Sequence, residues 1–341
     1  MICPHCERNL LLKERPGRVC SKCGRRYALD PKTNSLRLSD ARIKRLVEKL
    51  TDGGQLTISV NQLWAAAART TQKAGKSIAG GIGCTVFGVP VAVALIAAGV
   101  SIGGAAVVLV VLGALLLVSV VGAVVSTVSD RRALNESTLS TFRTTLLTDW
   151  KQIYGSLPPG VIEHYTAPAV QQPEGAHVAL LCHDKSIAAC LIANEIPQRY
   201  GVAVATEIQQ LPDAVPVIVL HDASPAGCQL PLRTRAALPG RRVVDAGLPP
   251  RAVMNAKGAV AVRRPKPAPD LIGRLRDSGT LTEAELAWLA KGWTVLLIAV
   301  PPVRLIAAVV RAVERVGATT DPDRRRAEAV GFLTWPGESG R

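Results

Sequence analysis

The sequence predicts a multidomain α+β membrane protein, and three observations support this. Two Cys-x-x-Cys pairs lie within the first 23 residues, no charged residue occurs between Lys76 and Asp130, and from residue 176 short apolar runs alternate with amphipathic stretches. These patterns are typical of a metal-binding ribbon, a pair of transmembrane helices and an open α/β sheet, respectively. The predicted parts are residues 1–30, a basic helical linker at 31–76, a transmembrane hairpin at 77–129, a helical connector at 130–160, a cytosolic α/β domain at 161–320 and a C-terminal tail at 321–341.

The positive charge is concentrated near the N-terminus. Residues 1–76 contain 16 Lys or Arg against 6 Asp or Glu, and residues 130–341 contain 25 against 20, in a chain of net charge +15. A basic segment beside a bilayer is attracted to anionic lipid headgroups, whereas the same charge on a free domain suits nucleic acid. We favour the lipid bilayer as the partner, with nucleic acid less favoured and a merely solvated surface as the third alternative.

Cysteine usage indicates a reducing compartment. Four of the eight cysteines form the two close pairs, and four are scattered: Cys84, Cys182, Cys190 and Cys228. The scattered ones are expected to be buried small apolar residues, because none lies beside an obvious base. No apolar run precedes residue 78, so no signal peptide is expected and the N-terminus should stay in the cytosol.

The two cysteine pairs are separated by thirteen residues, a spacing that lets them face each other. Four thiolates then close a tetrahedral site: Cys3, Cys6, Cys20 and Cys23. This motif resembles the zinc-ribbon family over about the first thirty residues, and the resemblance implies a structural Zn²⁺. His5 is expected to lie outside the shell, which four thiolates already fill. Two unrelated pairs or a redox dithiol are the alternatives.

Short strands are predicted between and after the cysteine pairs, at Leu10–Leu12, Val19 and Tyr27. The first knuckle has Glu7 where a glycine is common, while Gly24 in the second is expected to remove an obstructing Cβ. Basic residues around the motif permit nucleic-acid binding, but few aromatic residues accompany them. Beyond the ribbon, Ser39 and Asp40 are expected to begin a basic amphipathic helix that ends at 52–54, and a short helix follows at 62–69.

The uncharged stretch is 53 residues long, enough for two membrane crossings, which we place at 78–99 and 104–127. Lysines precede it and arginines follow it, as expected when both ends lie in the cytosol. The predicted location is the bacterial inner membrane, multi-pass, with both termini cytosolic. No ionisable side chain interrupts the stretch, which indicates an anchor and not a transporter. A buried helical hairpin is the alternative.

The C-terminal part has the pattern of an open α/β sheet. After a helical segment that ends at Pro158, strands are predicted at 177–182, 202–206, 215–220 and 242–246, with helices at 185–199 and 227–238. A further helix begins at Thr282, and an apolar run at 293–300 precedes a helix at 303–316. We interpret 293–316 as core, because a third crossing would have to place Arg304 in the bilayer.

Two loops follow predicted strands at the edge where parallel sheets carry chemistry. They contain His183 with Asp184, and Asp222 with Ser224. The second loop resembles the Toprim fold of topoisomerases and primases, which implies Mg²⁺ held by carboxylates. Here Ser224 replaces the second aspartate of the motif and His183 or Asp184 stands at the glutamate position, so Mg²⁺ would be held weakly. The alternative is that both aspartates cap helices.

The arrangement as a whole resembles uncharacterised zinc-ribbon membrane proteins of high-GC bacteria, which implies no particular activity. We therefore predict a membrane-anchored, non-catalytic binding or scaffold protein with an unknown protein partner. A membrane-tethered, degenerate Toprim-like enzyme that processes nucleotides or nucleic acid is the alternative. No catalytic or cofactor-binding residues are predicted besides the four cysteine ligands.

Overall fold

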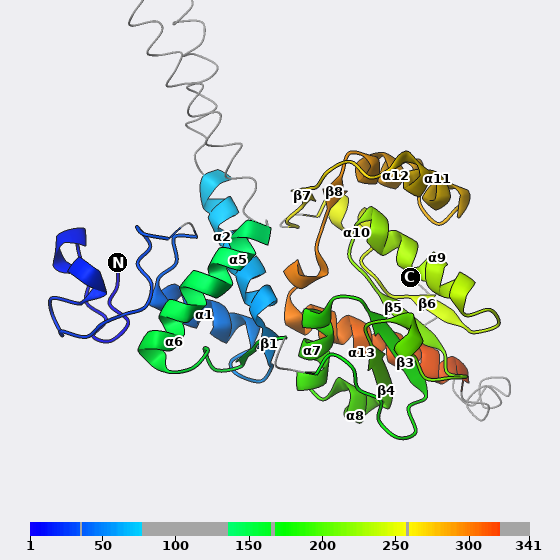
Figure 1. Ribbon diagram of the computed structural model, residues 1–341, viewed down its shortest axis with the longest axis horizontal. Helices are drawn as coiled ribbons and strands as arrows, with labels where there is room; N and C mark the ends of the chain where they lie inside the picture. Colours follow the sequence, from blue (N-terminus) through cyan, green and yellow to red (C-terminus); the bar gives the residue numbers. More distant parts are fainter. Residues whose placement is uncertain (35, 77–135, 165–167, 257–258, 321–341) are drawn as a thin grey trace, which may run out of the picture.

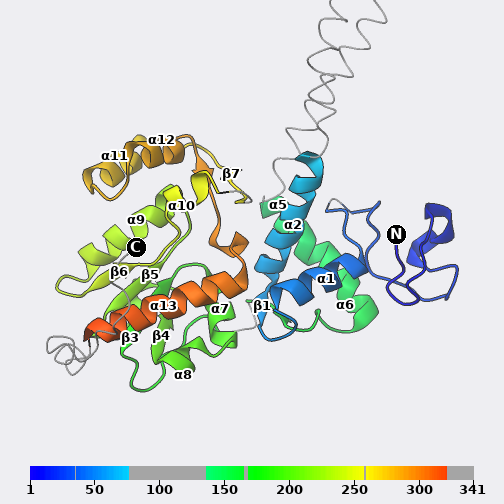
Figure 2. The ribbon, with the colours of Figure 1, turned by 180° about the vertical axis from the view of Figure 1, so that it is seen from behind.

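The computed structural model describes residues 1–34, 36–76, 136–164, 168–256 and 259–320. The N-terminal ribbon lies at one end, a layer of helices lies in the middle, and a sheet with its covering helices lies at the other end (Figure 1). The view from behind shows the same order (Figure 2).

The first 30 residues contain little regular structure. Two isolated antiparallel bridges and two 3-10 turns stand where short strands were predicted: Ile2 with Asn9, Val19 with Arg26, η1 (Leu12–Glu14) and η2 (Pro16–Arg18). Leu11 and Leu12 are 60% and 61% exposed, so the prediction of a strand there is wrong. The reason is that the chain turns outward after Leu10, which alone of the three leucines packs against the cysteines.

The middle layer is built from helices on both sides of the undescribed segment: α1 (Asp40–Leu50), α2 (Val60–Lys76), α5 (Glu136–Thr141), the π-helical turn η4 (Phe142–Leu147) and α6 (Thr148–Tyr154). Their apolar faces share one buried cluster that includes Ile43, Trp64, Phe142 and Trp150. A short parallel pair, β1 (Ile58–Ser59) with β2 (Val161–Ile162), joins this layer to the sheet part of the chain. Segments far apart in the sequence therefore fold as one unit.

The sheet has four parallel strands in the order β4-β3-β5-β6. They are β3 (Val178–Cys182), β4 (Val202–Ala205), β5 (Val217–Leu220) and β6 (Val243–Asp245), and their connections contain α7 (Lys185–Ala193), α8 (Ile196–Tyr200), the turn η5 (Ile208–Gln210) and α9 (Pro225–Ala237). All four predicted strands are confirmed to within two residues. The single helix predicted at 185–199 is divided into α7 and α8, because Glu195 adopts a left-handed φ of 60°.

Side chains of the central strand alternate between two cores, as the period of a β-strand requires. Val178 and Leu180 pack with α7 and with the final helix α13 (Pro302–Thr320), while Ala179 and Leu181 face α9. Helices therefore cover both faces of the sheet, and α13 crosses one of them (Figure 2).

The remaining described elements lie beyond α9 in the sequence: α10 (Pro250–Met254), β7 (Val262–Arg263), α11 (Pro269–Asp277), α12 (Glu283–Ala290), β8 (Trp293–Thr294) and the turn η6 (Leu297–Ala299). β7 and β8 form an antiparallel pair, and α11 and α12 pack beside α9. In α13, Leu305 and Val309 are buried while Arg304 and Arg311 are exposed. The interpretation of 293–316 as core is confirmed.

The predicted fold class, a membrane protein with a transmembrane hairpin, is corrected. The predicted hairpin at 77–129 lies outside the described residues, and within the described ranges no helix is both long and apolar enough to cross a membrane. Of the two longest, α13 buries one apolar face against the protein and exposes arginines on the other, and α2 buries most of the described side chains of its first turns in the middle layer. The predicted multi-pass location in the bacterial inner membrane is contradicted by the same finding. The fold class is mixed α/β with an N-terminal four-cysteine cluster.

Candidate metal centre

The two cysteine knuckles are built by one backbone pattern that recurs after 17 residues. In each, the first cysteine's N–H donates to a carbonyl five residues later, and its own carbonyl accepts the N–H four residues later. The corresponding bonds are Cys3 to Arg8 at 3.0 Å with Glu7 to Cys3 at 3.1 Å, and Cys20 to Arg25 at 3.0 Å with Gly24 to Cys20 at 2.8 Å. The two loops are therefore near-copies that face each other.

The fourth position after each first cysteine requires a left-handed backbone. Glu7 has φ 57° and Gly24 has φ 70°. A Cβ added at Gly24 would meet nothing within 4 Å, so the expectation that this glycine removes an obstruction is wrong. Its role is conformational, because glycine adopts positive φ without the steric cost that Glu7 incurs.

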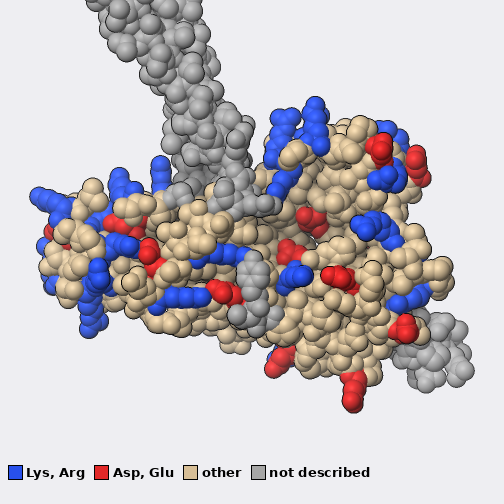
Figure 3. All heavy atoms as spheres, in the orientation of Figure 1, with Lys and Arg blue, Asp and Glu red and all other residues tan. Residues whose placement is uncertain are grey.

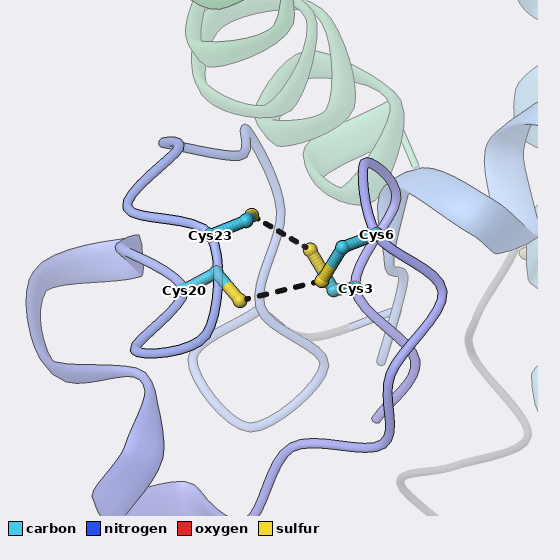
Figure 4. Close-up of side chains that lie close together, drawn as sticks. All are labelled: Cys3, Cys6, Cys20 and Cys23. Carbon is cyan, nitrogen blue, oxygen red and sulfur yellow. Dashed lines mark hydrogen bonds between the residues drawn. The ribbon is translucent and has the colours of Figure 1, made fainter.

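All four sulfur atoms lie within 4.8 Å of one another. The Sγ atoms of Cys3 and Cys23 are 3.9 Å apart and those of Cys6 and Cys20 are 3.8 Å apart. Figure 4 shows the side chains of the two knuckles pointing toward one another. Zn–S bonds of about 2.3 Å would place the sulfurs of a tetrahedral site about 3.8 Å apart, whereas a disulfide needs about 2.05 Å. The four cysteines are therefore free thiols placed closely enough to hold a metal ion.

The surroundings of the sulfurs differ between the two knuckles. Burial raises the pKa of Cys3 to about 11. At Cys20 burial acts in the same direction, but backbone N–H groups of Lys22 and Cys23 outweigh it and lower the pKa to about 7. N–H donors of this kind stabilise a thiolate, which is the form that binds a metal. His5 is outside the cluster: its Nε2 lies 2.8 Å from the carbonyl oxygen of Arg26.

The ribbon is attached to the helical layer by polar contacts. Arg18 Nη1 donates to Asp149 of α6 at 2.5 Å and to the carbonyl of Ala28 at 2.6 Å. Behind it, the guanidinium of Arg15 lies 2.8 Å from the carboxylate of Asp30, with both side chains about 5% exposed or less. The two side chains form an ion pair, but the angles at Arg15 Nη1 do not allow a hydrogen bond.

The edge of the sheet brings the two predicted aspartate loops together, because β3 and β5 are neighbours. Asp184 caps α7 by accepting the backbone N–H groups of Ser186 at 2.9 Å and Ile187 at 3.3 Å. Asp222 accepts the Ser224 hydroxyl at 2.6 Å, and Ser224 in turn caps α9. Burial raises the pKa of Asp222, although the hydrogen bond from Ser224 acts to lower it. The negative charge of Asp184 raises the pKa of Asp222 further.

Both carboxylates are thus used within the fold. Asp184 caps α7, as the capping alternative predicted, whereas Asp222 binds Ser224, which is the residue that caps α9. Among the described residues, the four cysteines are the ligating side chains that lie close enough together, in a group of three or more, to share a metal ion. Asp184, Asp222 and His183 do not form such a group. The described scattered cysteines are confirmed as buried, and burial raises the pKa of Cys190 and Cys228 to about 12. Cys84 lies outside the described residues.

His221 has a role that the sequence did not indicate. Its Nδ1 lies 2.7 Å from the carbonyl oxygen of Asp222, and its Nε2 lies 3.0 Å from Oδ1 of Asp245. Both neighbours are hydrogen-bond acceptors, so the protonated form of the buried ring can donate to both of them. Burial lowers the pKa of His221, but the hydrogen bond and charge of Asp245 outweigh it and raise that pKa.

The fold and the cysteine cluster define a mixed α/β protein with a candidate metal centre at its N-terminus. The chain matches no protein-family model, no curated protein and no solved structure with which it was compared. The zinc-ribbon and Toprim-like resemblances therefore stay predictions.

Proposed function

We propose that the chain is a non-catalytic binding protein whose N-terminal ribbon is held in shape by a structural Zn²⁺. The observation that carries the proposal is the mutual approach of four thiols to within 4.8 Å. Four soft thiolates at tetrahedral spacing suit Zn²⁺, and a shell that they fill has no open position for water or substrate.

The ribbon needs such a metal because it has almost no core of its own. Its buried cluster consists of Cys3, Leu10 and Cys20, with Cys6 and Cys23 packed against them. A segment this small is stable only with a staple, and a metal shared by both knuckles supplies one. The metal would thereby hold the surface of the ribbon in a fixed shape.

That surface is basic. Residues 1–30 contain seven Lys or Arg against three Asp or Glu. Figure 3 shows Lys and Arg side chains spread over the ribbon end of the molecule. A rigid basic surface favours an acidic partner, which supports a binding role over a catalytic one.

The test is the metal content of the purified full-length chain, measured by inductively coupled plasma mass spectrometry. We expect one Zn²⁺ per chain, and a thiolate charge-transfer band when Co²⁺ replaces it. Cys6→Ser should lower metal retention, while the matched control Cys228→Ser, at a buried cysteine far from the cluster, should not. A metal-free protein with four rapidly reacting N-terminal thiols would overturn the proposal and favour the redox-dithiol alternative.

A further inference from the structure

A pocket of about 550 Å³ lies between the ribbon and α6. The ribbon contributes His5, Arg18, Arg25 and Arg26 to its lining, and α6 contributes Asp149 and Tyr154. Its volume falls within the range of about 300–1,000 Å³ that small-molecule sites occupy. The sequence did not predict it, because its two walls are more than a hundred residues apart.

The charges in this pocket do not balance. Its one carboxylate, Asp149, is bound by Arg18 at 2.5 Å. Arg25 and Arg26 are exposed, and among the described contacts neither guanidinium has an ion pair. The pocket therefore has two excess positive charges, both on groups whose planar fork matches phosphate oxygens.

The rest of the lining offers an aromatic wall. The rings of His5 and Tyr154 have centroids 6.2 Å apart and are tilted by 35°. Tyr154 is held in place by its hydroxyl, which donates to Asp40 at 2.5 Å, and by Trp150, 4.5 Å away between ring centroids. Fixed aromatic rings beside arginines suit a planar base attached to a phosphate.

We propose that this pocket binds a nucleoside phosphate, with Arg25 and Arg26 contacting the phosphate and the wall formed by His5 and Tyr154 contacting the base. The inference rests on the proposed structural metal, because both arginines directly follow the second knuckle and the Arg25 carbonyl is bound to the N–H of Cys20. A base joined to a terminal phosphate occurs in two kinds of ligand, a free nucleotide and the 5′-phosphorylated end of a nucleic-acid strand.

The test is calorimetric titration of the full-length, metal-loaded protein with AMP, adenosine, inorganic phosphate and a single-stranded oligonucleotide with and without a 5′-phosphate. We expect AMP to bind and adenosine not to bind, and each of Arg25→Ala and Arg26→Ala to weaken AMP about tenfold. Arg8→Ala and Lys13→Ala, exposed ribbon cations outside the pocket, are the matched controls and should leave affinity unchanged.

Tighter binding of the oligonucleotide than of AMP would identify a strand end as the source, and the reverse would identify a free nucleotide. Equal losses in the control variants, or oligonucleotide binding that ignores the 5′-phosphate, would overturn the pocket. Metal analysis of each sample separates the two proposals. A zinc-loaded protein that binds neither AMP nor the phosphorylated oligonucleotide refutes the pocket alone, whereas a metal-free protein refutes the structural metal.

Discussion

Replacing Asp40 tests how the ribbon is held on the helical layer. This carboxylate is fully buried and accepts three hydrogen bonds: the N–H groups of Ala28 at 2.8 Å and Leu29 at 2.7 Å, and the hydroxyl of Tyr154 at 2.5 Å. It begins α1, yet its side chain binds the end of the ribbon and α6 and so joins three segments. Burial and the hydrogen bond to Asp40 raise the pKa of Tyr154.

Asp40→Ala leaves three donors without their acceptor. Hydrogen bonds to a charged group contribute about 1.5 kcal/mol or more each, so the free energy of unfolding should fall by about 4–5 kcal/mol. Tyr154→Phe removes one of the three and should cost about 1.5 kcal/mol. Asp40→Asn, which keeps the shape of the side chain, should cost about 2 kcal/mol, because its amide group faces one of the donors.

The assay is urea unfolding followed by tryptophan fluorescence, for which Trp150 lies close to Tyr154. The double variant Asp40→Ala/Tyr154→Phe should be less destabilised than the sum of the single variants, since they share a contact. Glu48→Ala, at an exposed position of α1, is the control and should change stability by about 0.5 kcal/mol or less. If Asp40→Ala behaved like Glu48→Ala, the buried carboxylate would not hold these segments together.

Four further substitutions test other parts of the fold by the same unfolding assay. Because the pKa of His221 is raised in the folded protein, its pair with Asp245 stabilises the protein below about pH 6.5, and this stabilisation is lost as pH rises through the folded-state pKa of His221. Asp245→Asn should flatten this pH dependence of the free energy of unfolding. An unchanged pH profile would refute the role of the pair. Gly247→Ala would place a Cβ 2.1 Å from the His221 ring and should cost at least about 2 kcal/mol, whereas Gly273→Ala, in open space within α11, should gain about 0.5–1 kcal/mol. Thr282→Ala removes the side-chain cap of α12 and should cost about 1 kcal/mol; no loss would show that the cap contributes nothing.

Local patterns predicted local structure well. Continuous apolar runs marked β3, β4 and β5 because the strands of a parallel sheet are buried on both faces. The break between α7 and α8 was missed, since nothing local showed that Glu195 would take a left-handed backbone. The membrane prediction is contradicted, because within the described ranges no helix is long and apolar enough to cross a membrane.

The sequence by itself determined the candidate metal ligands. Each Cys-x-x-Cys pair lies within one short loop, so the spacing of the two cysteines in the sequence is enough to predict that their sulfur atoms lie close together. Only the tertiary structure decided where the ribbon lies, because the residues that attach it, Arg18 and Asp149, are far apart in the sequence. It also decided that Asp184 caps α7, that Asp222 binds the capping residue Ser224, and that the buried ring of His221 lies beside Asp245. Contacts of this kind depend on strand order and on the docking of one part against another, which residue spacing does not encode.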